Sequence, residues 1–241
     1  MIEFRAKQLD TRKTTDLEAY DEIYRTQPIR QIDSFYKWAL ELASPRFGDR
    51  ILDVSCGVGR LVDLAARAGH SAIGIDLADE AIVHGHNHGV RGRLLIADAL
   101  ALPFQDNSFD CVINLGSIEH YPDPARGVAE AARVLRPDGR AVILLPNSFG
   151  YLHVLHVWRH GDVFDDGQPL QRYGTQADWR RLLESNGLRI VRVEKYQRVR
   201  PRTIGDVFWY LCRPTKVLQL LITPWLPINL AGCFAFICTR R

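Results

Sequence analysis

The stretch from Ile51 to Arg60, Ile-Leu-Asp-Val-Ser-Cys-Gly-Val-Gly-Arg, places the tightest constraint on how this chain folds. It begins as a short apolar run, which is typical of a parallel strand buried on both faces. Gly57 and Gly59 break the run, and a helical pattern over residues 61–68 follows and ends at Gly69. Since glycine has no Cβ, the backbone of such a turn approaches a ligand closely, and the first helical turn offers it unpaired N–H groups. The pattern predicts a ligand site between a strand and a helix.

Two classes of α/β protein use such a turn, and the neighbouring residues separate them. Dinucleotide-binding enzymes usually have a third small residue, G-x-G-x-x-G/A, and here that place is Val62. The run Leu-Asp-Val-Ser-Cys-Gly-Val-Gly from Leu52 instead resembles the first motif of the class I S-adenosylmethionine-dependent methyltransferases, L-D-x-G-C-G-x-G, with serine replacing one glycine. The resemblance implies that the methionine end of S-adenosylmethionine lies against Asp53, Ser55, Gly57 and Gly59.

Acidic residues follow the next two predicted strands. The strand at residues 71–76 ends in Asp76, at a spacing that suits a carboxylate accepting hydrogen bonds from both ribose hydroxyls of a nucleoside. The strand at residues 93–97 is followed by Asp98, and the resemblance implies that this carboxylate accepts from the adenine amino group. The other cofactor contacts that the resemblance implies are Leu77, Ala99, Asn114 and Leu115.

Two longer motifs make the resemblance more specific. Leu-Pro-Phe-Gln-Asp-Asn-Ser-Phe-Asp, from Leu102, resembles a pattern of the ubiquinone and menaquinone methyltransferase group. Arg-Val-Leu-Arg-Pro-Asp-Gly, from Arg133, also resembles a family motif, and its last four residues predict a turn before a strand at residues 140–145. The resemblance covers about residues 49–147. It implies an α/β, Rossmann-like, doubly wound fold with seven mostly parallel strands, the last one antiparallel and lying between the fifth and sixth.

We expect a single methyltransferase domain over residues 1–241. Residues 1–47 have a helical pattern, and the resemblance implies a lid over the cofactor, where Tyr20 and Tyr24 either border the substrate pocket or simply pack. Residues 48–147 form the cofactor half. The substrate half, residues 148–241, contains a short helix near His153–Arg159, a helix from Thr175 to Gly187, strands at 188–194 and 232–241, and an apolar insertion at 199–228.

The bulk properties restrict the partners and the location. A net charge of +3 is too mild to indicate a nucleic-acid-binding protein. The five cysteines lack the spacing of a metal site, and the first residues lack an apolar signal region, so we expect reduced thiols in a cytoplasmic protein.

His120 is the candidate catalytic residue, because it follows the strand at residues 109–115 at the edge where open α/β sheets bind ligands. It is either a base for a hydroxyl acceptor or a wall residue of the pocket. Some quinone O-methyltransferases carry a metal-binding Glu-x-x-Glu-His here, but the run Gly-Ser-Ile-Glu-His from Gly116 lacks the first carboxylate. The cluster of His84, His86 and His88 also lacks further ligands, so we expect no metal.

Arg172 and Tyr173 precede the last helix, where family members place residues that face the substrate. The alternative is that both are exposed loop side chains.

The insertion at residues 199–228 mixes basic and apolar residues. No charged residue occurs from Val217 to Cys238, which is long enough for a membrane span, but Pro224, Pro227 and the final strand argue against one. The insertion is therefore either an apolar cap over the acceptor pocket or an amphipathic patch at a membrane surface. Both alternatives indicate a hydrophobic or bulky acceptor, in the second case a lipid-like one.

The favoured function is methyl transfer from S-adenosylmethionine to a small molecule, most often to oxygen in similar sequences. The strand at 109–115 is not followed by the Asn-Pro-Pro-Tyr type of motif, which argues against methylation of DNA bases. The alternatives are an NAD(P)-dependent oxidoreductase, for which a Tyr-x-x-x-Lys is missing, and a non-catalytic cofactor-binding partner subunit.

Overall fold

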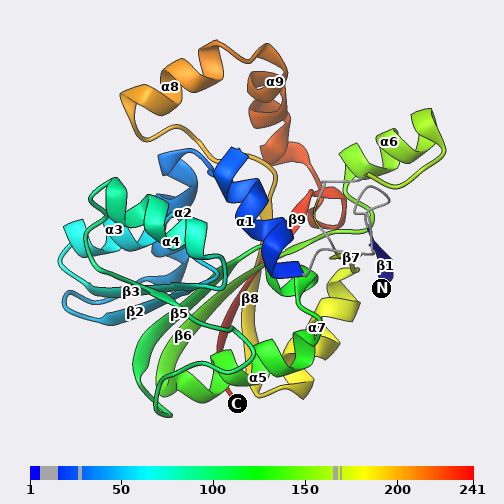
Figure 1. The fold of residues 1–241 in the computed structure, drawn as a ribbon. Helices are drawn as coiled ribbons and strands as arrows, with labels where there is room; N and C mark the ends of the chain where they lie inside the picture. The colour runs from blue at the N-terminus through cyan, green and yellow to red at the C-terminus, as the bar shows by residue number, and fades with distance from the viewer. Residues whose placement is uncertain (6–15, 27–28, 165–167, 169) are drawn as a thin grey trace.

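The protein is described here by a computed structural model that covers residues 1–5, 16–26, 29–164, 168 and 170–241 (Figure 1). The strands are β1 (Ile2–Arg5), β2 (Arg50–Val54), β3 (Ser71–Asp76), β4 (Arg93–Ile96), β5 (Phe109–Leu115), β6 (Leu135–Pro146), β7 (Leu170–Tyr173), β8 (Leu188–Tyr196) and β9 (Cys233–Arg240). The α-helices are α1 (Asp16–Thr26), α2 (Asp33–Ala43), α3 (Arg60–Arg67), α4 (Asp79–Asn87), α5 (Pro124–Val134), α6 (Tyr151–His160), α7 (Gln176–Ser185), α8 (Ile204–Leu211) and α9 (Pro214–Ile222). Three short 3₁₀ turns are η1 (Ile118–His120), η2 (Thr223–Trp225) and η3 (Ile228–Leu230).

A seven-stranded sheet in the order β4-β3-β2-β5-β6-β9-β8 forms the centre of the molecule. The pairs from β4 to β6 are parallel, whereas β9 is antiparallel to both of its neighbours. The predicted position of the last strand, between the fifth and sixth of the resembled fold, is therefore confirmed.

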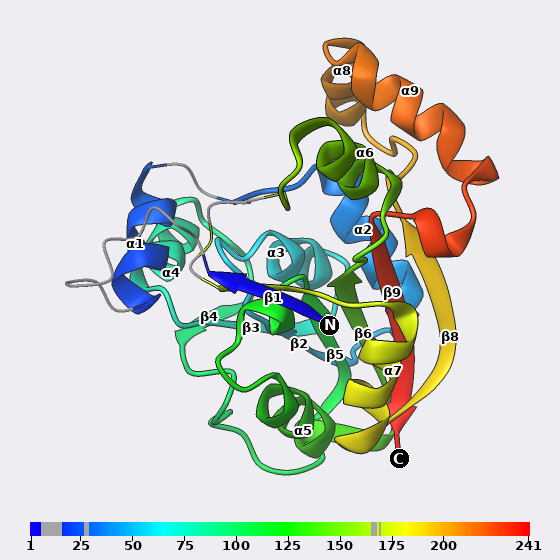
Figure 2. The same ribbon diagram turned by 90° about the vertical axis from the view of Figure 1, so that its right-hand side faces the viewer.

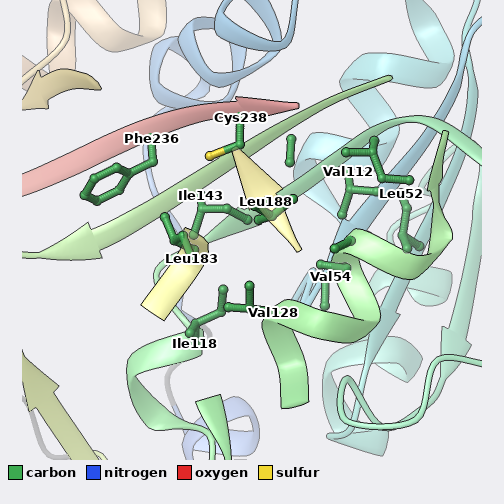
Figure 3. Close-up of a cluster of buried hydrophobic side chains, with 14 of the residues drawn as sticks. Leu52, Val54, Val112, Ile118, Val128, Ile143, Leu183, Leu188, Phe236 and Cys238 are labelled. Atoms are coloured by element: carbon green, nitrogen blue, oxygen red, sulfur yellow. The ribbon is translucent and has the colours of Figure 1, made fainter. Parts of the chain in front are cut away.

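Helices cover both faces of this sheet, with α2, α3 and α4 on one side and α5 and α7 on the other (Figure 2). Successive strand residues therefore alternate between two buried layers. Ile51 and Ile113 join the layer with α2 and α3, while Leu52 and Val112 join the layer with α5 and α7 (Figure 3). This two-sided burial explains why the strands are continuous apolar runs.

The prediction that residues 1–47 are helical is wrong at the N-terminus, because Ile2–Arg5 forms β1. This strand pairs antiparallel with β7 and places Ile2 opposite Tyr173. Both strands are only four residues long, and their partners are far apart in the sequence, so neither has a clear local signal. The helix α2 packs on the sheet, since Phe35, Ala39 and Leu42 belong to the buried core.

The predicted turn from Arg136 to Gly139 is wrong as well, because β6 already begins at Leu135. The register to β5 shifts between Phe109 and Cys111, so this part of the strand is irregular. A Cβ at Gly139 would lie 2.8 Å from the carbonyl oxygen of Asp110, so any other residue at this position would crowd the neighbouring strand.

The insertion folds as α8 and α9 and is tied to α2 by a polar contact. The buried Asp206 of α8 accepts a hydrogen bond from the Ser34 backbone N–H at 2.8 Å and a short one from the Ser34 hydroxyl. The Arg202 N–H donates to the same hydroxyl oxygen at 2.7 Å. No helix of the described chain is both long and apolar enough to cross a bilayer.

Candidate active site

A cavity of about 710 Å³ lies at the carboxyl ends of the parallel strands. Its wall includes residues at the ends of β2, β3 and β5, residues of α1, α6 and β7, and residues that follow β4 and β8. We call the part around Asp53, Gly57 and Asp98 the β2–β4 end, and the part around Tyr173 and Arg198 the β7–β8 end. Since open α/β sheets bind ligands at this edge, the cavity is the candidate active site.

Gly57 forms the turn at the β2–β4 end and has a φ of +53°. A Cβ at this position would lie 2.8 Å from the Tyr24 hydroxyl oxygen, so a side chain would crowd the cavity wall. The Gly57 N–H donates to Asp76 Oδ2 at 2.8 Å, and the Ala78 N–H donates to Oδ1 at 3.0 Å. Burial raises the pKa of Asp76, and these backbone donors oppose the increase. The carboxylate is thus held in one orientation at the cavity wall.

Asp53 is 4% exposed and also lines the cavity. Burial raises its pKa well above the usual value, and the nearby negative charge of Asp76 adds to this effect. Its carboxylate accepts no hydrogen bond from the part of the chain that the structure describes. A ligand group that is cationic or donates hydrogen bonds would therefore complement Asp53.

Asp98, Ala99 and Leu77 lie together at the wall of the β2–β4 end, as the sequence predicts. The Leu100 N–H donates to Asp98 Oδ1 at 2.8 Å, which orients this carboxylate after β4. Ala99 is 8% exposed, so it offers a small apolar surface beside the acid.

Two of the predicted cofactor residues do not line the cavity. Gly59 has a φ of +75°, and its absent Cβ would lie 2.7 Å from a methyl carbon of Leu94, so this glycine permits close packing below the turn. The buried Asn114 donates to the carbonyl oxygen of Val54 at 3.1 Å and thereby links β5 to β2. The neighbouring Leu115 does line the cavity.

Ser55 occupies the place of the usual glycine and keeps a glycine-like conformation, with a φ of +60°. Its hydroxyl lies 2.7 Å from the Tyr121 hydroxyl, which also accepts from Asn114 Nδ2 at 3.0 Å. Tyr121 lines the cavity and was not predicted. Its contact with Ser55 spans 66 positions, so no local pattern indicates it.

His120 lies in η1, where its side chain is 6% exposed and lines the cavity. Its Nδ1 is 2.5 Å from the carbonyl oxygen of Leu170. Since a carbonyl oxygen only accepts, Nδ1 carries the proton and Nε2 carries the lone pair of the neutral ring. Glu119 Oε1 lies 3.9 Å from Nε2, so a carboxylate lies close to the nitrogen that a proton would occupy in the charged ring.

Arg172 and Tyr173, both predicted to face the substrate, point to opposite sides of β7. The Arg172 guanidinium donates to Glu3 at 2.8 Å and to the carbonyl oxygen of Tyr121 at 2.5 Å, and Arg172 is not part of the cavity wall. Tyr173 lines the cavity and stacks edge-on against His153 at 4.7 Å between ring centroids.

Tyr20 and Tyr24 of α1 both line the cavity. Tyr24 packs against Ala78 and Ala81, and burial raises the pKa of its hydroxyl. An ion pair between Arg25 and Glu80, with 3.1 Å between nitrogen and oxygen, also links α1 to α4.

His84 and His88 stack with 4.5 Å between ring centroids. Throughout the described ranges, no three histidine, cysteine or acidic side chains come close enough together to hold a metal ion.

The β7–β8 end contains wall residues that the sequence analysis missed. Tyr196 ends β8 and packs against Phe35 and Trp38 at centroid distances of 5.0 and 5.3 Å. Gln197 and Arg198 follow directly, and Gln171 joins them from β7. These residues come from segments without a recognisable motif, so only the fold brings them to the cavity.

The match to a family model for a methyltransferase domain covers residues 52–143. A probable S-adenosylmethionine-dependent methyltransferase of Mycobacterium tuberculosis is 33% identical over 128 residues, which are 51% of this chain and 47% of that protein. A ubiquinone biosynthesis O-methyltransferase of Paracidovorax citrulli is 34% identical over 120 residues, 47% of this chain and 50% of that protein. The chain thus spans about half the length of the curated relatives it matches.

Solved structures share the fold over nearly the whole chain. A putative methyltransferase in complex with the Trm112 activator of Haloferax volcanii superposes with a TM-score of 0.64, at 20% identity, over 93% of this chain and 96% of that one. The fold, the matched region and the relatives agree, and none of these relatives is an oxidoreductase. Residues 52–143 therefore form a methyltransferase domain, similar to those of S-adenosylmethionine-dependent methyltransferases.

Proposed function

We propose that this protein transfers a methyl group from S-adenosylmethionine to an oxygen of a hydrophobic or bulky small molecule. The observation that carries the proposal is one continuous cavity that joins the acids and glycine turn of the β2–β4 end to His120 and an aromatic wall. The similar ubiquinone biosynthesis protein, which is named as an O-methyltransferase, supports oxygen as the accepting atom.

The residues of the β2–β4 end fit the cofactor of this family. The buried carboxylate of Asp53, to which no described residue donates a hydrogen bond, suits the ammonium group of the methionine end, and the turn at Gly57 leaves room for it. Asp76 would accept from the ribose hydroxyls and Asp98 from the adenine amino group, because carboxylates accept several hydrogen bonds. When bound, S-adenosylmethionine supplies a methyl group already activated by its sulfonium.

The role of the chain is then to align the acceptor and to remove its proton. Nε2 of His120 would take the hydroxyl proton as the oxygen attacks, and Glu119 would stabilise the charged ring. The hydrogen bond from Nδ1 to Leu170 fixes the tautomer that this role requires. The aromatic wall would exclude water and hold the acceptor in line.

Calorimetry with S-adenosylhomocysteine tests the cofactor assignment. We expect S-adenosylhomocysteine to bind the wild type and NAD not to bind. In Asp76→Ala the binding free energy of S-adenosylhomocysteine should weaken by about 2–3 kcal/mol, because a charged acceptor of two hydrogen bonds is removed. Asp79→Ala is the matched control, since Asp79 is an exposed acid outside the cavity wall. Binding of NAD without binding of S-adenosylhomocysteine would overturn the assignment.

Incubation with labelled S-adenosylmethionine and a metabolite extract, read by mass spectrometry, identifies the acceptor. With that acceptor, His120→Ala should lower kcat by roughly 10²–10⁴-fold, the range of general-base catalysis, and leave the affinity for S-adenosylhomocysteine unchanged. His86→Ala, an exposed histidine outside the wall, should keep full activity. Equal rates for His120→Ala and the wild type would make His120 a wall residue.

The insertion supports a second proposal, contact with an anionic membrane surface. No residue from 199 to 231 lines the cavity, so α8 and α9 do not close it, and their apolar side chains are largely exposed. Figure 2 shows α6, α8 and α9 gathered at one end of the molecule. Trp158 of α6 and Trp225 of η2 are 81% and 87% exposed.

The charge of this surface favours anionic lipid as its partner. Residues 199–230 contain four lysine or arginine residues, of which Arg202 pairs with Glu41, and one acid, Asp206, which is buried against Ser34. Tryptophans beside basic residues are typical of the interface between lipid and water. This arrangement would give the cavity access to a lipid-like acceptor.

Co-sedimentation with vesicles of phosphatidylglycerol and phosphatidylcholine tests this contact. We expect binding at low salt that weakens at high salt and in the Trp158→Ser, Trp225→Ser variant. Trp209 is not included, because it is half-buried and the Arg213 guanidinium carbon lies over its ring, 4.6 Å from the ring centroid. Phe47→Ser is the matched control, since Phe47 is 88% exposed but precedes β2 at the amino ends of the strands. No binding at low salt would overturn the proposal.

A further inference from the structure

Arg198 is the one lysine or arginine that lines the cavity within the described part of the chain. It follows β8 and is half-buried, and its Nε donates to Gln219 Oε1 of α9 at 2.9 Å. No carboxylate oxygen of the described residues lies within 4.0 Å of its nitrogens. The cavity wall therefore carries a permanent positive charge without an acidic partner.

The groups whose pKa values respond to Arg198 include Tyr196, Cys233 and Lys216, none of which is a carboxylic acid. Burial raises the pKa of the Tyr196 hydroxyl, and the positive charge of Arg198 opposes that increase. Burial also raises the pKa of Cys233 to about 12, with Glu119 adding to the effect and Arg198 opposing it. Partial burial lowers the pKa of Lys216, and Arg198 lowers it further. Glu119 acts on Cys233 and Asp206 acts on Tyr210, as Arg198 does, but no acid of the described residues forms an ion pair with Arg198.

The position of Arg198 separates it from the cofactor residues. Asp53 lies near the end of β2, and four strand intervals separate β2 from β8, which amounts to about 19 Å at the usual spacing of strands. Figure 2 shows β4 and β8 at opposite edges of the sheet. An anion bound at Arg198 therefore belongs to the molecule that occupies the β7–β8 end.

We propose that the acceptor carries an oxyanion group, a carboxylate or a phosphate, that binds the Arg198 guanidinium. This proposal rests on the proposed function, because it names a chemical class for the acceptor of that reaction. The guanidinium presents paired N–H donors that match both oxyanions, and Gln219 holds its Nε in place. The apolar part of the acceptor lies against the aromatic wall at Tyr196, Phe35 and Tyr36.

Binding of three eight-carbon probes to the protein saturated with S-adenosylhomocysteine tests the proposal by calorimetry. Octanoate, octyl phosphate and octanol share one apolar chain and differ in the head group. We expect at least one of the two anions to bind the wild type ten-fold or more tightly than octanol does. The anion that binds more tightly identifies whether a carboxylate or a phosphate fits the site.

Arg198→Met should remove this preference and leave the affinity for octanol unchanged, because methionine keeps the apolar stem without the charge. Arg198→Lys should keep the preference in weaker form, since the charge remains but the planar fork is lost. Arg200→Met is the matched control, because Arg200 is an exposed cation two positions on that does not line the cavity. Circular dichroism checks that each variant is folded.

Equal binding of the anions and octanol by the wild type, or a preference that survives in Arg198→Met, would overturn the proposal. A loss of S-adenosylhomocysteine affinity in Arg198→Met would also overturn it, since the charge would then serve the cofactor. Failure of the wild type to bind S-adenosylhomocysteine would instead contradict the proposed function. The head-group preference, measured without that ligand, then still decides whether Arg198 is an anion site.

Discussion

At the scale of single residues, Ser55 in the cavity wall combines an unfavourable backbone conformation with a hydrogen bond that compensates it. Ser55 has a left-handed backbone that costs a residue with a Cβ about 1 kcal/mol. Its hydroxyl contact with Tyr121 offsets this cost by about 1 kcal/mol, the usual net value of a hydrogen bond. The serine is thus tolerated where family members have glycine because a partner on the cavity wall compensates it.

Replacement of Ser55 by glycine tests this compensation. In the wild-type background we expect Ser55→Gly to change the free energy of unfolding by less than about 0.5 kcal/mol, because the strain and the hydrogen bond are lost together. In a Tyr121→Phe background the same change should stabilise the protein by about 1 kcal/mol. Urea unfolding of the four proteins measures both values. A destabilising effect in both backgrounds would refute the balance.

The raised pKa of Asp53 predicts that ligand binding is coupled to the release of a proton. This pKa is raised by burial and by Asp76, so the free protein holds a proton there at a higher pH than an exposed acid does. If a ligand ammonium binds beside it, the charged carboxylate is favoured, the pKa falls and a proton is released. The affinity for S-adenosylhomocysteine should therefore rise with pH across the titration of Asp53.

Calorimetry in buffers of different ionisation enthalpy, from pH 5 to 8, measures that release. Asp53→Asn should abolish it, whereas Asp79→Asn, at an exposed position, should not. Identical proton release in the wild type and Asp53→Asn would separate Asp53 from the ligand.

At the scale of elements, α7 shows how a local signal decides where a helix begins. Thr175 accepts a hydrogen bond from the Asp178 N–H at 3.2 Å, and Asp178 accepts from the Thr175 N–H at 3.0 Å. Both residues of this capping box are visible in the sequence, and the predicted start of the helix is confirmed. The helix ends at Ser185 with Asn186 as its C-cap, and Gly187 comes next, with a φ of +92°.

The capping box gives a pH-dependent prediction. Hydrogen bonds from the Thr175 N–H and hydroxyl lower the pKa of Asp178 to about 2, below its unfolded value of about 3.9. Its stabilising contribution is therefore complete above about pH 4 and is lost as the pH falls towards 2. Asp178→Asn should cost about 1 kcal/mol at pH 7, the size of a cap, and much less near pH 2.

Urea unfolding at both pH values measures this difference. Glu184→Gln is the control, because Glu184 is a half-buried acid of the same helix that pairs with Arg180 and takes no part in the cap. An equal cost at both pH values would show that the Asp178 charge does not support the cap.

At the scale of the whole molecule, the two buried layers of the sheet control the chemistry of the thiols. Of the five cysteines, Cys111 and Cys238 are buried, Cys56 and Cys233 are half-buried, and Cys212 of the insertion is exposed. Burial raises the pKa of Cys111 and Cys238 to about 12, and burial also raises the pKa of Cys56 well above its usual value. Cys233 has a pKa of about 12 for the same principal reason.

Titration with Ellman's reagent at pH 8 should therefore detect one rapidly reacting thiol in the folded protein. The thiolate is the reactive form, and a pKa of about 12 leaves roughly one thiolate in 10⁴ at pH 8. Cys212→Ser should remove the fast phase, and urea should expose all the remaining thiols. A second fast thiol that persists in Cys212→Ser would show that the sheet opens in solution.

The sequence by itself determined the parts of the site that lie within a few residues of a strand end. Asp53, Gly57, Asp76 and Asp98 follow from strands that the apolar runs predict, and parallel strands bring their carboxyl ends to one edge. The strand order was predicted through the family resemblance of these motifs, and the structure confirms it.

Only the tertiary structure decided the β7–β8 end of the cavity and the environment of the insertion. Pairing of β1 with β7 turns Arg172 away from the cavity and Tyr173 towards it, and the direction depends on register, which no local pattern specifies. The contacts of Ser55 with Tyr121 and of Ser34 with Asp206 join segments 66 and 172 positions apart. Local propensity acts over a few residues, whereas burial, charge compensation and exposure depend on which distant segments the folded chain brings together.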